Sequence, residues 1–145
     1  MRIIKSYQFW SEQIKYGVRP PKYLSAITYA QVGQMPEEYQ YLFRNPKTRI
    51  LIGTQHSGLW SVPDFVKCQV RLIDKCHAKL ILFHKRANGG EPSAWVTSNN
   101  CECSAWMNVF DKTDYNTAKF VFDCLWEKAR KATSTPKYNL EELRS

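Results

Sequence analysis

Long apolar runs are missing from this sequence. No run reaches the roughly 18 residues that a membrane span requires, and the N-terminus, MRIIKSYQFW, lacks the apolar core of a signal peptide. We therefore expect a cytoplasmic protein with no membrane partner. The cysteines also lack a disulfide-scaffold pattern and are odd in number, which favours reduced thiols: Cys68, Cys76, Cys101, Cys103 and Cys124.

Acidic residues are scarce compared with basic ones. The chain has 13 Asp and Glu against 21 Lys and Arg, a net charge of +8. This excess favours an anionic partner such as nucleic acid. At 145 residues, with 43% hydrophobic content, the chain can build one core and hardly two. We expect a single domain over residues 1–132, with an N-terminal docking helix and linker over 1–22, and a polar tail over 133–145.

The residue pattern predicts alternating strands and helices. In the docking helix, Tyr7, Trp10 and Ile14 share one face. Aromatic and β-branched residues predict strands over 23–30, 48–52 and 69–73. Pro36 opens a helix over 36–44, so the first two strands should form a β-α-β unit. The strand over 69–73 should pair with a strand around His77 in a tight hairpin through Asp74 and Lys75.

The second half of the chain continues this alternation. A short apolar run predicts a strand over 94–96, and another strand is expected over 105–110. Asp114 is a good helix cap, because apolar residues repeat at helical spacing directly after it. Together these patterns predict the α/β class.

Four polar residues stand in pairs within this framework. His77 and Lys79 are two residues apart on one predicted strand, and Ser98 and Asn100 are two apart at the end of the next. Residues i and i+2 of a strand share a face, so each pair should point to one side. A Gly-rich polar loop joins the two strands.

This pattern resembles the His-x-Lys and Gly-Ser-x-Asn signature of the phospholipase D superfamily, in particular its small nuclease branch. The resemblance runs from about Tyr23 to about Lys131. It implies a phospholipase D-like α/β fold with a mixed sheet flanked by helices on both faces and one motif per chain. It also implies a metal-independent phosphodiesterase that needs no cofactor, most simply an endonuclease that cleaves DNA.

The resemblance assigns catalytic roles to five residues. His77 would attack phosphorus to form a phosphohistidine, and a second histidine would protonate the leaving oxygen. Lys79, Ser98 and Asn100 would donate hydrogen bonds to the phosphate oxygens, and Asp111 stands roughly where nuclease members carry an acid that steadies the histidine. Because the chain holds only one copy of the motif, a complete site requires a homodimer.

Further residues are candidates for binding the substrate. His56 follows a predicted strand at its carboxyl end, where ligands settle in open α/β sheets. Lys75, Lys85 and Arg86 flank the proposed site and would contact phosphates, which carry little sequence information. Trp60, Trp95 and Trp106 could stack on unpaired bases, although aromatics inside strands more often belong to the core. We expect DNA rather than RNA as the partner.

Three alternatives stay open. Cys76, His77, Cys101 and Cys103 have the ligand types of a zinc site, although their spacing fits no known zinc signature. A lipid phosphodiesterase is disfavoured by the small size and the lack of a membrane-docking stretch. The third is a catalytically weak or inactive nucleic-acid-binding module with the same fold. It follows from two departures from the family pattern: Thr97 replaces the motif glycine, and Phe83, His84 and Lys85 occupy the place where many members carry an aspartate.

Overall fold

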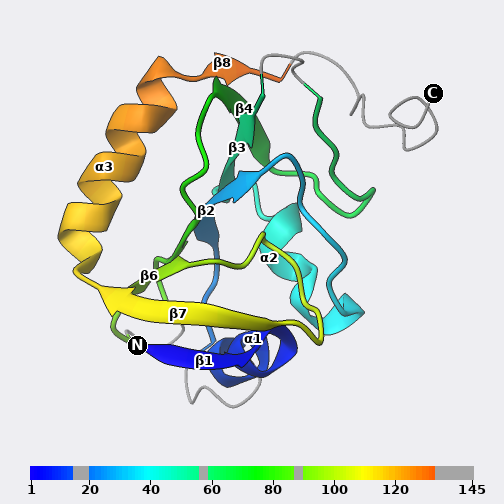
Figure 1. Ribbon diagram of the computed structural model, residues 1–145, viewed down its shortest axis with the longest axis vertical. Helices are drawn as coiled ribbons and strands as arrows, with labels where there is room; N and C mark the ends of the chain where they lie inside the picture. The colour runs from blue at the N-terminus through cyan, green and yellow to red at the C-terminus, as the bar shows by residue number, and fades with distance from the viewer. Residues whose placement is uncertain (15–19, 56–58, 87–89, 133–145) are drawn as a thin grey trace.

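An eight-stranded mixed sheet organises the chain, in the order β1-β7-β6-β5-β2-β3-β4-β8 (Figure 1). The computed structural model describes residues 1–14, 20–55, 59–86 and 90–132. The strands are β1 Arg2–Lys5, β2 Leu24–Tyr29, β3 Arg49–Thr54, β4 Gln69–Asp74, β5 Leu80–Phe83, β6 Ser93–Thr97, β7 Met107–Thr113 and β8 Arg130–Lys131. The helices are α1 Ser6–Ile14, the 3₁₀-helix η1 Glu37–Tyr39, α2 Tyr41–Arg44 and α3 Tyr115–Lys128. The predicted α/β class and mixed sheet are confirmed.

Strands β2, β3 and β4 run parallel, and the other pairings between the described strands are antiparallel. The β-α-β unit is confirmed, since β2 and β3 pair in parallel and the helical segment lies between them in sequence. That segment is not one helix over 36–44, because it divides at Gln40 into η1 and α2. The carboxyl ends of the parallel strands therefore lie at one edge of the sheet.

The central strands are buried on both sides. Ile50 and Ile52 of β3 belong to a core cluster that includes side chains of α1 and α2. Leu51 lies between them in the strand and belongs to a second cluster, with Ala118 and Phe122 of α3. Successive side chains of a strand point to opposite faces, so Ile50, Leu51 and Ile52 meet an apolar environment on both faces of the sheet. This explains why β3 contains a continuous apolar run.

The predicted hairpin between residues 69–73 and the His77 strand is wrong. β4 pairs with β3 and β8, whereas β5 pairs with β2 and β6. The almost fully buried strands β2 and β3 lie between β4 and β5, and each has a strand partner on both sides. The chain crosses from β4 to β5 through residues 75–79, and β5 begins at Leu80. His77 and Lys79 therefore precede the strand and do not lie in it.

The two ends of the described chain also refine the predictions. β1 was not predicted; it pairs with β7 at the sheet edge and leads directly into α1. In α1, Phe9, Trp10 and Ile14 are buried, whereas Tyr7 is 45% exposed. The strand predicted over 105–110 is β7, which extends to Thr113 and includes Asp111. The Asp114 cap is confirmed, since its carboxylate accepts from the Thr117 backbone N–H at 2.8 Å.

None of the helices in the described ranges combines the length and apolarity of a membrane span.

Candidate functional site

The crossing segment 75–79 lies against the carboxyl ends of β3 and β2. The Lys75 N–H donates to the Thr54 carbonyl at 2.8 Å, and Lys75 has a φ of 58°, which turns the chain back over the sheet. A Cβ on Gly53 would lie 2.0 Å from the Cys76 carbonyl oxygen. Only glycine leaves room for this approach. Gly53 therefore determines where the residue after Cys76 comes to lie.

That residue is His77, whose side chain is exposed and held on an aromatic ring. The imidazole stacks on Tyr29, the last residue of β2, with the ring centroids 4.2 Å apart and the planes 19° from parallel. Stacked rings restrict the side-chain torsions, and such pairs contribute about 0.5–1.5 kcal/mol beyond burial. The histidine is therefore oriented while its edges stay open to solvent.

Asn100 reaches the same strand end from the segment after β6. Its Oδ1 accepts from the Tyr29 N–H at 3.1 Å and from Thr28 Oγ1 at 3.5 Å. The neighbouring Cys101 N–H donates to Thr28 Oγ1 at 3.0 Å, which fixes the loop. In the described part of the chain nothing bonds the Asn100 Nδ2 group, so its donors are available. The structure thus brings His77 and Asn100 together around Tyr29.

Lys79 lies beside this group through the pairing of β5 with β6. Its carbonyl accepts from the Thr97 N–H at 3.2 Å. The side chain is partly buried, and no described residue forms an ion pair or hydrogen bond with its ammonium. Lys79 therefore brings an unneutralised positive charge to the segment that holds His77.

Ser98 is exposed but its hydroxyl is occupied. Ser98 Oγ donates to Asn108 Oδ1 at 3.0 Å and accepts from the Val109 N–H at 2.9 Å, so it is directed toward β7. Thr97, at the position of the motif glycine, turns the chain here: its Oγ1 donates to the Val109 carbonyl at 2.7 Å and accepts from the Asn99 N–H at 2.9 Å. Threonine lacks the backbone freedom of glycine, and here its hydroxyl fixes the turn through these two hydrogen bonds.

The other predicted site residues do not join this group. Asp111 lies in β7, separated from β5 by β6, and its carboxylate pairs with the N-terminal amine at 3.5 Å. Lys85 and Arg86 follow β5 and lie at the strand end opposite His77. Arg86 donates to the Glu91 and Gln13 carbonyls, both at 3.1 Å, which gives it a structural role. Lys75 is exposed at the start of the crossing segment, and His56 lies outside the described residues.

The residues of the alternative zinc site are divided between the two core clusters. Cys101 is buried in the cluster under α1, with Cys103 packed against it, whereas Cys76 packs against the cluster under α3. Burial raises the pKa of the Cys101 thiol, which disfavours the thiolate that zinc requires. No group of three or more potential ligands is present in the described ranges. The structure does not support this alternative.

His84, which was not predicted as a functional residue, is the centre of a buried network. Its Nε2 lies 2.6 Å from Ser25 Oγ and its Nδ1 lies 2.6 Å from the Tyr115 hydroxyl. Burial, together with the charges of Arg49 and Lys119, lowers the pKa of His84 to about 4. The neutral imidazole therefore joins β2 and α3 at the end of β5, where many members of the resembled family carry an aspartate.

Tyr29 and Gly53 are the site residues that sequence reasoning missed. Both stand at the carboxyl ends of parallel strands, a position that could have drawn attention to them. Of the three tryptophans considered for base stacking, Trp60 and Trp95 pack in or against the core and Trp106 is 77% exposed.

Comparison of the sequence with models of known protein families and with curated proteins finds no match.

Proposed function

We propose that the protein is a metal-independent phosphodiesterase, an endonuclease that cleaves DNA through a phosphohistidine at His77. The observation that carries this proposal is the arrangement around Tyr29. An exposed imidazole is stacked on the tyrosine ring. The Asn100 Oδ1 accepts from the tyrosine N–H, and no described residue accepts from its amide donors. A nucleophile and a hydrogen-bond donor for a phosphate oxygen thus meet at one strand end.

The proposed reaction has two steps. His77 attacks phosphorus, the bond to the leaving oxygen breaks, and the histidine of a second subunit gives that oxygen a proton. Water, deprotonated by the second histidine, then displaces His77 and releases the phosphate end. Lys79 and Asn100 stabilise the charge that builds up on the non-bridging oxygens. Ser98 would assist only after giving up its bond to Asn108.

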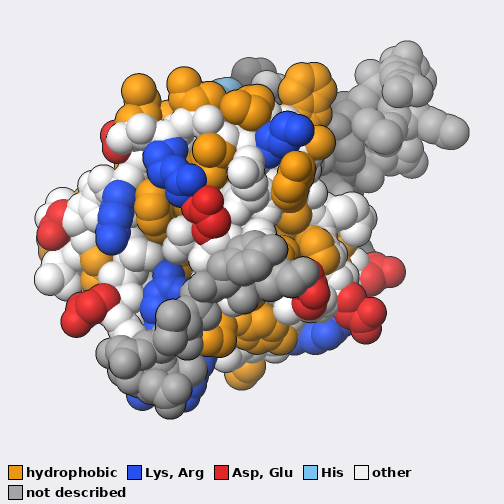
Figure 2. All heavy atoms as spheres, turned by 90° about the horizontal axis from the view of Figure 1, so that it is seen from below, with side chains coloured by type: hydrophobic (Ala, Val, Ile, Leu, Met, Phe, Trp, Pro, Cys, Tyr) orange, Lys and Arg blue, Asp and Glu red, His pale blue; other side chains and the backbone are white. Residues whose placement is uncertain are grey.

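A homodimer is part of the proposal because one chain supplies one motif histidine. The surface next to Ser98 favours such a contact: its partner Asn108 follows Trp106 and Met107, which are 77% and 56% exposed. Ile3 of the adjacent β1 is 59% exposed. Figure 2, which views the molecule from the side of β1 and β7, shows hydrophobic side chains along its upper margin and again in its lower part. A two-fold pairing there would cover them and bring two sites together.

The net charge of +8 supports nucleic acid as the substrate. Lysines and arginines are distributed along the whole chain, so contacts would be made mainly to phosphates. We therefore propose cleavage without a fixed base sequence.

Incubation of purified protein with plasmid and single-stranded DNA in excess chelator tests the proposal. The wild-type protein should cut, and the His77→Ala variant should bind DNA without cutting it. Lys128→Ala, which removes an exposed charge from the last turn of α3, should cut like the wild type. Cutting only after addition of a divalent metal, or cutting by His77→Ala, would contradict the proposal.

A second candidate is a catalytically weak or inactive nucleic-acid-binding module. The occupied hydroxyl of Ser98 favours it, because that donor faces β7 and not the phosphate. Such a module would shift the mobility of DNA without cutting under any condition, and His77→Ala would bind as the wild type does. The same incubation therefore distinguishes the two functions.

A further inference from the structure

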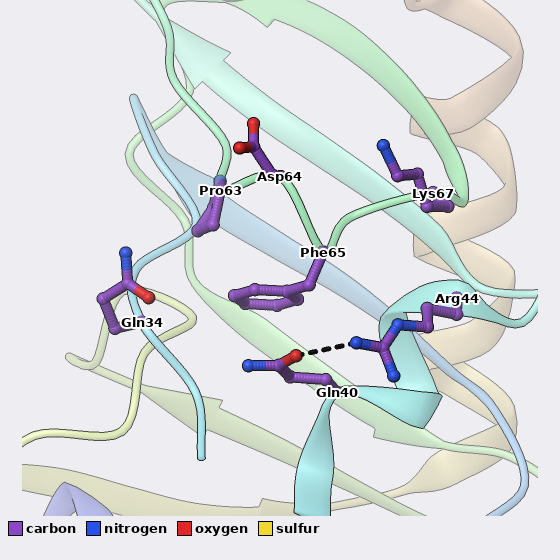
Figure 3. Close-up of a pocket in the computed structure, with 7 residues that line it drawn as sticks. All are labelled: Gln34, Gln40, Arg44, Pro63, Asp64, Phe65 and Lys67. Atoms are coloured by element: carbon purple, nitrogen blue, oxygen red, sulfur yellow. Dashed lines mark hydrogen bonds between the residues drawn. The ribbon is translucent and has the colours of Figure 1, made fainter. Parts of the chain in front are cut away.

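An open pocket of about 670 Å³ lies on the face of the sheet that carries α2 and is lined mainly by polar side chains (Figure 3). This volume falls within the range of ligand sites. Three segments form it: residues 30–35 after β2, the η1–α2 segment, and the connection between β3 and β4. Its lining includes Gln34, Gln40, Arg44, Asp64, Phe65 and Lys67.

The walls of the pocket are fixed to one another. Gln31 and Ser61 form an isolated parallel bridge, and the Val32 N–H donates to the Ser61 carbonyl at 3.1 Å. On the opposite side the Lys67 N–H donates to the Phe43 carbonyl at 2.9 Å. The pocket is therefore formed before any ligand arrives, which reduces the cost of ordering on binding.

An aromatic ring lies in the middle of the pocket. Phe65 is partly buried and packs edge-to-face on the fully buried Phe43, with the ring centroids 5.6 Å apart. Figure 3 shows the Phe65 ring between Gln40 and the upper wall, in the space that the lining residues surround. A partly buried ring that is fixed by such an edge-to-face contact can serve as a stacking surface for a planar ligand.

The polar groups of the pocket differ from one side to the other. In Figure 3, Arg44 and Lys67 lie on one side of Phe65, and Gln34 lies on the other with Asp64 above. Gln40 orients the arginine: its Oε1 accepts from Arg44 at 2.9 Å while its Nε2 donates to the Met35 carbonyl at 3.0 Å. A planar ligand with an anionic group at one end fits this polarity.

Three of these polar groups are unpaired. In the described part of the chain no side-chain hydrogen bond or ion pair involves Gln34, Asp64 or Lys67. An amide and a carboxylate can bond the edge of a base, and an ammonium can bond a phosphate. Because these three groups have no partner among the described residues, a ligand can bond them without first breaking a hydrogen bond or ion pair of the protein.

We propose that this pocket binds one nucleotide unit of a single-stranded nucleic acid, with its base on Phe65 and its phosphate between Arg44 and Lys67. The inference rests on the proposed nuclease function, because the bound nucleotide would be part of the nuclease substrate. Binding of a nucleotide to the pocket can be measured separately. Gln34 is five residues from Tyr29, a reach of no more than roughly 18 Å of extended chain. A single strand bound at His77 would reach the pocket around the end of β2, where residues 30–35 leave the sheet.

Titration of the full-length protein with adenosine monophosphate, followed by backbone-amide NMR shifts and calorimetry, tests the proposal. The shifts should occur in the three pocket segments. Ribose 5-phosphate, which lacks the base, should bind about tenfold more weakly, since stacking contributes substantially to base binding. Equal binding of both probes, or shifts only around His77, would overturn the proposal.

Variants sharpen this test. Phe65→Leu, which keeps apolar contact with Phe43, should weaken binding about tenfold, and Lys67→Ala should weaken it about threefold. Lys128→Ala, an exposed lysine of α3, should bind as the wild type does and serves as the matched control. Unchanged affinity in Phe65→Leu would overturn the stacking role.

The same variants separate this inference from the nuclease proposal. The His77→Ala protein should bind adenosine monophosphate normally, so a failure of cleavage leaves the pocket measurement intact. In an active enzyme, Phe65→Leu should raise KM for single-stranded DNA and leave kcat unchanged. A fall in kcat alone would contradict a binding role for the pocket.

Discussion

Tyr29 holds the side chain on which the proposed reaction depends. Its ring stacks on His77 and its N–H binds Asn100, so one residue orients two others. The N–H belongs to the backbone and survives any substitution except proline. A change of side chain therefore tests the stack alone.

Replacing Tyr29 with Leu should lower kcat about two- to tenfold, because the stack worth about 0.5–1.5 kcal/mol no longer restricts the imidazole. Tyr29→Phe keeps the ring and should retain kcat, with KM unchanged in both variants. Steady-state cleavage of plasmid DNA measures these constants. Equal activity of the Leu and Phe variants would show that the stack has no part in positioning His77.

Gly53 is the second positioning residue, since its bare Cα lets the Cys76 carbonyl approach the end of β3. In Gly53→Ala the new methyl group would push residues 75–79 away, so we expect a lower melting temperature and a large loss of kcat. Thr54→Ala, which removes the 2.8 Å bond to Asp74 at the same strand end, should lose stability but keep most of its kcat. Thermal unfolding and cleavage rates measured on both variants check this. If kcat falls in proportion to the melting temperature in both the Gly53→Ala and the Thr54→Ala variant, Gly53 has no specific role in positioning His77.

At the scale of secondary-structure elements, His84 joins two strands to a helix. The end of β5, β2 and the first turn of α3 meet through its bonds to Ser25 and Tyr115. Burial lowers the pKa of His84 to about 4, below the 6.5 of an exposed histidine. Between these values the unfolded chain binds the proton and the folded protein does not. The stabilisation is thus complete above pH 6.5 and is lost as the pH falls to 4.

The free energy of unfolding should therefore fall by about 3 kcal/mol between pH 6.5 and pH 4 through this residue. His84→Gln, which carries no titrating group, should be less stable at neutral pH but should lack this part of the pH dependence. Urea unfolding at several pH values gives the comparison. If the variant and the wild type lose stability in parallel as the pH falls, protonation of His84 is not the cause.

The elements themselves were largely predictable, and their order in the sheet was not. Aromatic and β-branched residues identified β2, a continuous apolar run identified β3, and the cap at Asp114 identified α3, because these signals are local. Which strands lie next to β4 and β5 depends on how all eight strands are ordered in the sheet. The local sequence of β4 or β5 does not contain this information. Hence the predicted hairpin was wrong, and the crossing segment that places His77 on Tyr29 could not be foreseen. His77, Lys79, Ser98 and Asn100 were predicted as a group, but the Ser98 hydroxyl bonds Asn108 and the Val109 N–H instead. Asp111 was taken from its spacing after Asn100 and lies in β7.

At the scale of the whole molecule, one motif per chain predicts that both subunits are needed for each cleavage. When wild-type and His77→Ala subunits are mixed in equal amounts and allowed to exchange, about a quarter of the dimers should contain two histidines and remain active. Independent sites would instead leave half of the activity. Cleavage rates over a series of mixing ratios distinguish a square-law decline from a linear one. A protein that sediments as a monomer at working concentration while cutting DNA would contradict the composite site.

The most direct test is capture of the covalent intermediate. Radiolabelled DNA is mixed with enzyme in excess chelator, the reaction is quenched with denaturant at alkaline pH, and protein-bound label is measured and mapped to a peptide. The label should accumulate on the peptide that contains His77 and should be absent from the His77→Ala variant. Rapid cleavage without any protein-bound label, or label attached to a residue other than His77, would contradict the proposed mechanism.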